Sequence, residues 1–166
     1  MNIADYESIL NIILYKGRPY ANPVICKLGT QVHVDKIGEW FPIGLSCQSG
    51  RVEYVKYASN IRGTMPNRRN VGITFFHYVI INFLSLNGYS IGVKIFKSGS
   101  MLIIGAKSGE ELKHVIDCVL GMMKNGICGD DGKNIDFVEE QDKAEIVNIK
   151  PVQMPVPGSW RNVGGE

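Results

Sequence analysis

The chain has 166 residues, 45% of them hydrophobic and 20% charged, with a formal net charge of +2. This length can bury the core of one domain, and the composition is ordinary for a soluble globular protein. The longest apolar run, within YVIINFLSL, is too short to span a membrane. Asp5 and Glu7 interrupt the start of the chain, where a signal peptide would lie. We therefore expect no membrane partner.

Four cysteines, at positions 26, 47, 118 and 128, lie at wide and irregular spacing without a CxxC pair. Such spacing indicates free thiols and an intracellular, reducing compartment.

Charge is distributed unevenly along the chain. Residues 51–107 carry eight Lys or Arg side chains against the single carboxylate of Glu53, whereas residues 108–166 carry six basic and eleven acidic side chains. This asymmetry predicts an anion-facing surface in the middle and an acidic segment at the end. The alternative is that these charges are only solvated loops and helix faces.

The first half of the chain predicts a helix followed by strands. Residues 3–15 place apolar side chains at roughly helical spacing, and the stretch 17–23 ends this helix. Residues 24–34 alternate like a strand, and residues 35–41 form a short helix that Asp35 can cap. Residues 51–58 alternate like a second strand. Residues 61–70 are predicted to be a polar, basic loop.

The second half predicts a hairpin, a further strand and a long helix. Residues 77–86 and 89–96 are strands joined by the turn signal Asn87–Gly88. Residues 101–107 follow as another strand, after the turn KSGS. Ser108 and Glu111 form a capping box, and the apolar residues beyond them repeat at helical spacing. The fold class is therefore α+β, a curved antiparallel sheet with helices packed on one face.

The C-terminal segment changes character. Residues 130–143 are acidic and loop-like, and residues 144–156 form either one more strand or an extended tail broken by prolines. We also consider that the segment 130–145 folds over the basic surface and mimics phosphate. The expected organisation is an N-terminal helical extension (1–20), a sheet-and-helix unit (21–126) and an acidic, proline-rich segment (127–166).

The sequence shows no motif of a catalytic or metal-binding site. The chain has no glycine-rich phosphate loop, no nucleophile elbow and no Cys/His pair at metal-binding spacing. The three histidines lie far apart in the sequence. We therefore expect no catalytic residue, no metal and no cofactor, and an enzyme with an accessory domain of this kind is the weakest hypothesis.

The last two strands predict a binding surface instead. Alternation leaves Lys94, Phe96, Leu102 and Ile104 on the face opposite the long helix. An apolar face rimmed with cations needs a partner. Nucleic acid supplies phosphates for the cations and base steps for an apolar wedge. A protein partner would explain only the apolar part.

The run IFKSGSMLIIGAKS at 95–108 resembles the signature of the TATA-box-binding protein family, in which TGAKS precedes a long helix. The runs NPVICKLGTQVHVDKIGEW and RVEYVKYASNIRG look like the first strand and helix of the family's repeat and its next strand. The insertion before the hairpin is similar to that of divergent relatives encoded by large DNA viruses. The resemblance covers roughly residues 22–124 and implies half of a saddle, with one clear repeat within 21–126.

The resemblance also implies roles for single residues. Phe96 corresponds to a phenylalanine that wedges between base steps, and Leu102 and Ile104 to positions that touch the minor groove. Asn22 corresponds to an asparagine that bonds base edges, and Phe76 to a second wedge. The basic candidates for DNA contact are Lys94, Lys97, Lys107, Arg68 and Arg69.

The chain also departs from the family. Ser100 stands where the turn usually ends in Lys, Ile104 replaces a Thr, and only one of two repeats is clear. A complete saddle would require a homodimer, a partner or a longer chain. We expect a transcription factor that binds double-stranded DNA, in the nucleus or a cytoplasmic viral factory. The alternative is a protein-interaction or virion structural module of the same fold that has lost the DNA site.

Overall fold

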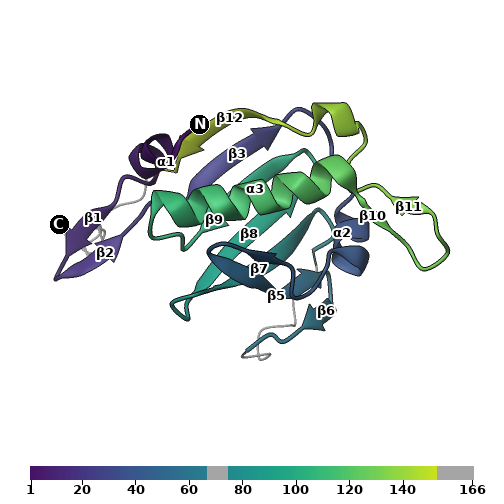
Figure 1. Ribbon diagram of the computed structural model, residues 1–166, viewed down its shortest axis with the longest axis horizontal. Helices are drawn as coiled ribbons and strands as arrows, with labels where there is room; N and C mark the ends of the chain where they lie inside the picture. The colour runs from purple at the N-terminus through teal and green to yellow at the C-terminus, as the bar shows by residue number, and fades with distance from the viewer. Residues whose placement is uncertain (67–74, 153–166) are drawn as a thin grey trace, which may run out of the picture.

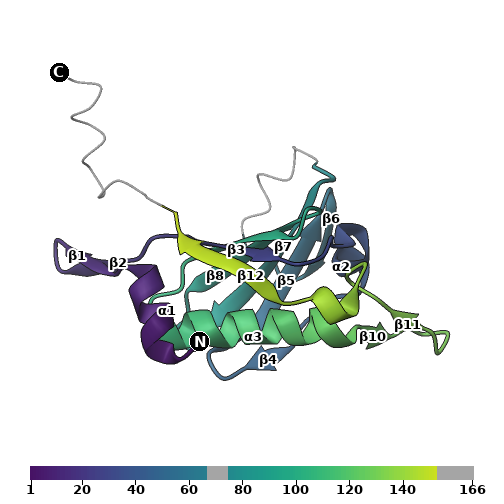
Figure 2. The same ribbon diagram turned by 90° about the horizontal axis from the view of Figure 1, so that it is seen from above.

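The structure, a computed structural model, describes residues 1–66 and 75–152. Most of these residues build one open antiparallel sheet, and the helices lie together on one of its faces (Figures 1 and 2). This confirms the expected α+β class. None of the helices in these ranges is long and apolar enough to cross a membrane. The helices are α1 (Ile3–Leu10), α2 (Val34–Trp40) and α3 (Gly109–Asn125), with a short 3-10 helix η2 (Gln141–Lys143).

Within the described residues the sheet has eight strands in the order β12–β3–β9–β8–β7–β5–β4, and β6 also pairs with β5. The strands of the sheet are β3 (Val24–Leu28), β4 (Ser46–Cys47), β5 (Gly50–Tyr57), β6 (Asn60–Gly63), β7 (Tyr78–Ser85), β8 (Ser90–Phe96), β9 (Ser100–Ile104) and β12 (Ile146–Pro151). Two small hairpins stand apart from it: β1 (Ile13–Tyr15) with β2 (Arg18–Tyr20), and β10 (Ile127–Cys128) with β11 (Asn134–Ile135).

The core lies between the sheet and α3. Residues paired directly across neighbouring strands share a face of the sheet. The row that faces α3 is at most 2% exposed and consists of Val24, Ile103, Val93, Ile81 and Val55. The side chains of α3 that cover it are Leu112, Val115, Ile116, Val119 and Met123. The apolar residues at every second position of the strands therefore pack against the apolar face of α3 and form one core with it.

The N-terminus of α3 is fixed by several hydrogen bonds. Ser108 is its N-cap, and the Ser108 hydroxyl accepts the Glu111 N–H at 3.2 Å, which is one half of the predicted capping box. The Glu111 carboxylate accepts the Lys107 N–H at 2.7 Å. Glu7 of α1 accepts the Gly109 N–H at 2.6 Å. Carboxylates at this position also offset the positive end of the helix dipole, so both α1 and the end of β9 hold α3 in place.

The N-terminal helix is shorter than the predicted range 3–15. It ends at Leu10 because Asn11 adopts a left-handed conformation, with φ 49°, and its N–H bonds to the Glu7 carbonyl. Asparagine tolerates this conformation at a helix end. The β1–β2 hairpin follows, so the helical prediction for its first strand was wrong. Three residues are too few for apolar spacing to separate a helix from a strand.

The predicted basic loop 61–70 begins later than expected, because its first residues form β6. Arg62 turns toward the helices, where its guanidinium donates to the carbonyls of Gly38 at 2.7 Å, Phe41 at 2.8 Å and Ile37 at 3.2 Å. Carbonyls at the end of a helix lack partners within the helix. Arg62 therefore caps α2 and is not available to an anion on the other face.

The C-terminal segment joins the sheet and the core. Its described part forms the strand alternative: β12 pairs antiparallel with β3, and Asn148 lies opposite Lys27. The first part of the segment 130–145 does not cover the basic surface, whereas Glu139 shares a pocket with Lys97. Residues 129–133 lie in the turn between β10 and β11, which projects away from the sheet (Figure 1). Beyond that turn, Phe137 is buried against Phe41, with ring centroids 5.8 Å apart, so apolar packing decides the path of the segment.

Candidate nucleic-acid interface

The face of the sheet opposite the helices carries one continuous row of side chains across six strands. Leu102 lies opposite both Ile25 and Lys94, and Ile80 lies opposite both Lys94 and Lys56. Apolar and cationic side chains alternate along much of the row, and none of them is acidic. We call it the open-face row; it consists of Lys150, Ile25, Leu102, Lys94, Ile80 and Lys56.

The open-face row is accessible. Lys150 is exposed and the other five side chains are half-buried. The helices lie on the other side of the sheet, as the view along its plane shows (Figure 2). An apolar floor crossed by ammonium groups suits a polyanion that also offers apolar surface, which a nucleic-acid groove does.

Ile104 lies further along β9, directly opposite Gly92. Because glycine has no side chain, no neighbour on β8 covers Ile104, and it stays 49% exposed. On the other side of Gly92, Asn82 is only 4% exposed, and its amide donates to the Ser90 hydroxyl at 3.4 Å. This part of the open face therefore offers one prominent apolar side chain beside a buried amide.

Phe96 ends β8 inside a cluster of aromatic rings. Tyr78 lies opposite it on β7 with ring centroids 5.7 Å apart, and His77 stacks on it at 6.1 Å. Phe75 stacks on Tyr78 at 5.5 Å. The Lys94 ammonium lies 4.0 Å from the Tyr78 centroid and 5.6 Å from that of Phe96, within cation–π range. We call Phe75, His77, Tyr78 and Phe96 the aromatic cluster; it occupies one end of the open face.

The turn behind Phe96 is anchored to the neighbouring chain segment. The Gly99 N–H donates to the Phe96 carbonyl at 2.9 Å, and the Leu28 N–H donates to the Gly99 carbonyl at 2.9 Å. Gly99 has φ 96°, and a Cβ there would lie 2.4 Å from the Thr30 carbonyl oxygen. Only glycine fits this position. Phe96 therefore stands on a preorganised backbone, as an inserting side chain requires.

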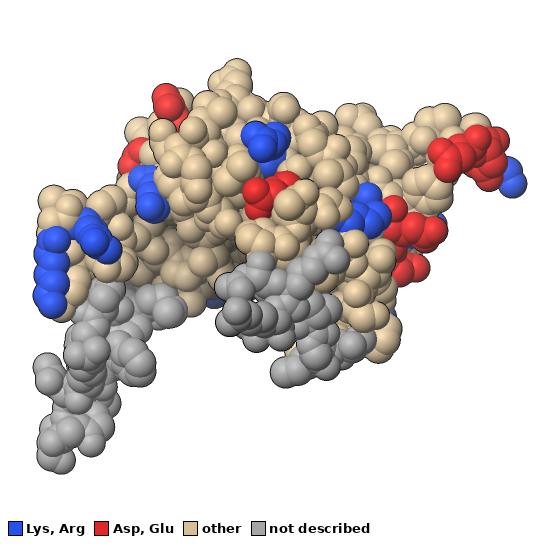
Figure 3. Space-filling view, turned by 90° about the horizontal axis from the view of Figure 1, so that it is seen from below, with Lys and Arg blue, Asp and Glu red and all other residues tan. Residues whose placement is uncertain are grey.

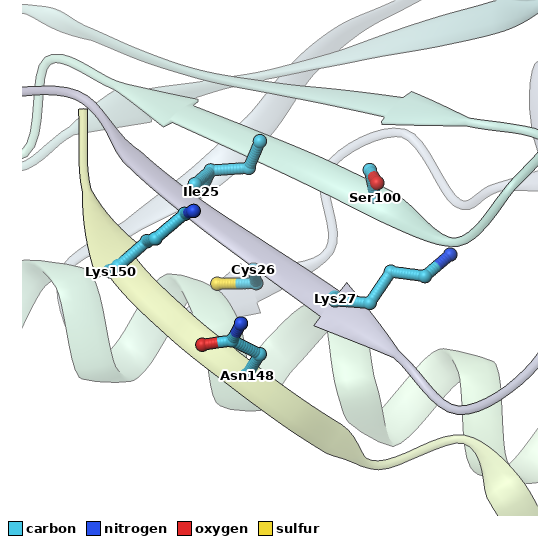
Figure 4. Close-up of a pocket in the computed structure, with 6 residues that line it drawn as sticks. All are labelled: Ile25, Cys26, Lys27, Ser100, Asn148 and Lys150. Carbon is cyan, nitrogen blue, oxygen red and sulfur yellow. The ribbon is translucent and has the colours of Figure 1, made fainter.

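Strand β12 widens the open face with a shallow polar pocket (Figure 4). The side chains that line it come from β3, β9 and β12, and Lys27 also donates to the Ser98 carbonyl. Two ammonium groups and an amide share the pocket, which suits phosphate oxygens or the acceptor atoms of base edges. The polar lining residues are Lys27, Ser100, Asn148 and Lys150.

Lys107 is exposed beside the start of α3, and its ammonium lies 4.1 Å from the centroid of the Tyr89 ring. The Tyr89 hydroxyl donates to the Glu111 carboxylate. Burial, followed by this hydrogen bond, raises the pKa of Tyr89 above its ordinary value. Tyr89 therefore stays a neutral donor at physiological pH, and its ring keeps Lys107 at the end of the sheet that carries Ile104.

Charged side chains of both signs are spread over the surface, and the two ends of the molecule differ in which sign predominates (Figure 3). Seen from below, Lys and Arg lie over the β1–β2 hairpin at one end, whereas Asp and Glu gather at the end with the β10–β11 hairpin (Figure 3). The acidic residues of the β10–β11 turn therefore lie at the end of the molecule away from the β1–β2 hairpin (Figure 1). The field that a polyanion meets on the open face comes chiefly from the lysines of the strands.

The structure brings four predicted site residues onto one face. Lys94 and Leu102 are partners in the open-face row, Ile104 extends it, and Phe96 stands at its aromatic end. Lys97 is exposed in the turn that follows Phe96. Arg68 and Arg69 lie outside the described residues.

Two other predicted residues lie elsewhere. The Phe76 and Tyr57 rings lie edge to face with their centroids 6.1 Å apart, and the Tyr57 hydroxyl donates to the Phe76 carbonyl at 3.2 Å. Tyr57 pairs with Val79 in a row that faces the helices, so Phe76 lies apart from Phe96. Asn22 precedes β3, and its N–H donates to the Leu10 carbonyl at 3.0 Å, which ties it to α1.

Sequence reasoning missed several residues of the open face. The alternation within β3 already separates Ile25 and Lys27 from their buried neighbours, so the signal was present there. Residues 77–86 read as one continuous apolar strand, which hid the outward direction of Tyr78 and Ile80. Lys150 could be found only from the pairing of β12 with β3.

The three histidines lie in separate places. His33 precedes α2, His77 belongs to the aromatic cluster, and His114 of α3 contacts the Ser49 hydroxyl through Nδ1 at 2.6 Å. Across ranges 1–66 and 75–152, no three His, Cys, Asp or Glu side chains gather closely enough to hold a metal ion.

Comparison with known proteins gives two matches. Residues 75–125 match the family model described as transcription factor TFIID, or TATA-binding protein. A protein of Acanthamoeba polyphaga mimivirus, described as TATA-box-binding protein-like, is 28% identical over 138 residues. That match covers 75% of this chain but 36% of the viral protein, so the chain spans about a third of its relative. No solved structure matches the chain.

Proposed function

We propose that this chain, which is similar to the TATA-box-binding protein family over residues 75–125, binds double-stranded DNA through the open face of its sheet and acts in transcription. The open-face row is the observation that carries this proposal. It crosses six strands, faces away from the helices and alternates apolar side chains with lysines. The lysines would neutralise phosphates while the apolar side chains meet the groove floor.

We propose that the aromatic cluster supplies the wedge. Phe96 is the central ring, and Phe75, which stacks on its neighbour Tyr78, is better placed to assist it than Phe76. Unstacking a base step costs a few kcal/mol, which contacts along the rest of the face must offset. Lys94 and Lys97 would meet phosphates at this end, and Lys107 would lie at the other.

The binding surface of one chain is about half of a two-repeat saddle. We propose that a second copy or a partner chain supplies the other half, beside β12, which ends the described sheet on that side. A mass measurement with and without duplex tests this part. A mass of two chains per duplex supports a homodimer, whereas one chain per duplex at saturation contradicts the homodimer.

The test of the main proposal is a gel shift with an AT-rich duplex at several salt concentrations. Wild-type affinity should fall steeply as salt rises, because each lysine–phosphate contact releases counterions. The Leu102→Asp variant should lose binding while its thermal unfolding stays cooperative. Binding that is absent, or insensitive to salt, contradicts the proposal.

Two observations favour a second candidate function, a protein-interaction or virion structural module. Ile104 is exposed where the family has a threonine, and Lys94 is already engaged with Tyr78 and Phe96. An apolar partner surface would cover Ile104 as well as DNA would. Phe96→Ala separates the two functions, since it should then weaken assembly with the partner and leave nucleic-acid binding unaltered.

A further inference from the structure

The hairpin β1–β2, residues Ile13–Tyr20, projects from one end of the molecule (Figure 1). It pairs only with itself and is not part of the large sheet. It leads into the start of β3, which pairs with the end of β9, so it emerges beside Ile104. This is the end of the open face opposite the aromatic cluster. We call it the N-terminal hairpin.

The N-terminal hairpin contributes little to the core. Leu14 is 77% exposed, and Ile13 and Tyr20 are each 37% exposed. A two-stranded hairpin is marginally stable by itself. Its turn is well specified, because Lys16 and Gly17 both have positive φ, 52° and 74°, as a tight hairpin turn requires. A defined, projecting element with exposed apolar and basic side chains indicates a contact surface.

The hairpin and the end of β9 enclose a groove. Arg18 and Tyr20 share one face of the hairpin, because they pair with Tyr15 and Ile13. Together with Ile104 and Lys107 they line the groove, and none of its lining residues is acidic. Lys16 stands at the tip of the hairpin, with its ammonium 5.4 Å from the Tyr15 ring centroid. Two cations, Arg18 and Lys107, therefore line a groove with an apolar floor, and Lys16 lies beyond it at the hairpin tip.

The groove continues the open face, since Ile104 belongs to both. DNA that lies on the open-face row and leaves it at the Ile104 end would pass between the hairpin and Lys107. We propose that the N-terminal hairpin binds the phosphate backbone of DNA flanking the segment held on the sheet, through Lys16 and Arg18. This inference rests on the proposed function and adds a contact that the sheet alone does not provide.

The test compares two double variants that each remove two positive charges. Lys16→Ala/Arg18→Ala changes the hairpin, and Lys36→Ala/Lys133→Ala changes exposed lysines of α2 and of the β10–β11 turn, away from the open face. Binding to a fluorescent AT-rich duplex is measured by anisotropy over a series of salt concentrations. Each phosphate contact contributes about 0.9 to the slope of log K against log salt. The hairpin variant should lower that slope by roughly 2, and the control by much less.

Duplex length separates a flanking contact from general electrostatics. As the duplex is shortened, the advantage of the wild type over the hairpin variant should disappear before binding itself is lost. Arg18→Glu should weaken binding to the long duplex further. Thermal unfolding of both double variants should match the wild type, because the changed side chains lie on the surface.

The outcomes are distinguishable. Suppose that the wild type binds DNA and that Leu102→Asp abolishes binding. Equal salt slopes for the hairpin and control variants would then overturn this inference and leave the proposed function standing. The inference is also overturned if the wild type binds more tightly than the hairpin variant by the same factor at every duplex length. A wild-type chain that does not bind duplex DNA overturns the proposed function, and the inference with it.

Discussion

Phe96 lies directly opposite Tyr78 in the β7–β8 ladder, with ring centroids 5.7 Å apart, and Lys94 places its ammonium near both rings. These contacts support Phe96 from one side while leaving it half-exposed at the end of the sheet. In the proposed role as a wedge, Phe96 would have to keep its position while base steps separate around it. The aromatic cluster gives Phe96 that support without any help from the helices.

Phe75 and Phe76 provide a direct comparison at this end. Phe96→Ala should weaken duplex binding about tenfold or more, in line with the few kcal/mol involved at an unstacked step. Phe75→Ala should weaken it less, and Phe76→Ala least, because the Phe76 ring lies against Tyr57. Anisotropy titrations of the three variants rank them. A larger effect from Phe76 than from Phe75 would show that the cluster assigned here is not the contacting one.

A charge placed in the open-face row should block binding without unfolding the chain. Leu102→Asp puts a carboxylate between Ile25 and Lys94, where it would repel phosphate and bind the lysine. Leu86→Asp is the matched control, because Leu86 is 77% exposed in the β7–β8 turn, outside the row. We expect the control to retain most of its affinity. Equal losses in the two variants would mean that net charge, and not the row, decides affinity.

Gly99→Ala tests the turn that carries Phe96. The new methyl group would lie 2.4 Å from the Thr30 carbonyl oxygen at a φ of 96°, so both strain and clash oppose it. Gly132→Ala is the control, since Gly132 has φ 80° but nothing within 4 Å of a Cβ. The control should cost roughly 1 kcal/mol of unfolding free energy, and Gly99→Ala clearly more. Urea unfolding measures both, and similar values would rule out the close approach.

Arg62 stabilises the fold and is not part of the proposed DNA surface. Arg62→Met removes the guanidinium from three carbonyls at the end of α2. Hydrogen bonds to a charged group contribute about 1.5–3 kcal/mol, so the unfolding free energy should drop by about 2 kcal/mol. The DNA affinity of the folded variant should match the wild type, because Arg62 faces the helices. A variant of normal stability that binds DNA weakly would reverse this assignment.

The rate at which each cysteine reacts with a thiol reagent should indicate whether that cysteine is buried in the folded chain. Burial raises the pKa of Cys26 from 9.0 to about 12, whereas Cys128 is exposed. The thiolate is the reactive form, so at pH 8 a thiol reagent should modify Cys128 quickly and Cys26 only after unfolding. Because the folded pKa of Cys26 is raised, its contribution to stability is complete below pH 9 and is lost as the pH rises toward 12. Mass spectrometry of the labelled chain locates the modified residue, and early labelling of Cys26 would contradict its burial in the core.

The sequence predicted much of the sheet and the long helix because the strands alternate clearly and Ser108 is a good N-cap for the helix. Phe96, Leu102 and Ile104 could be placed on one face from alternation alone. The β1–β2 hairpin was missed because its strands are only three residues long. Arg62 was misread as part of a loop, since its partners are carbonyls 21 to 25 residues earlier in the chain. Lys150 joins the open face only through long-range pairing with β3, which no local pattern specifies.

The central claim is that DNA meets the open face of the sheet. Methyl NMR measures this directly, because Ile25, Ile80, Leu102 and Ile104 carry methyl groups on that face, whereas Ile37 and Leu112 lie on the helix side. Addition of an AT-rich duplex should shift the four open-face methyl signals strongly and the helix-side signals little. Shifts confined to the helix side, or no shifts at saturating duplex, would contradict the account.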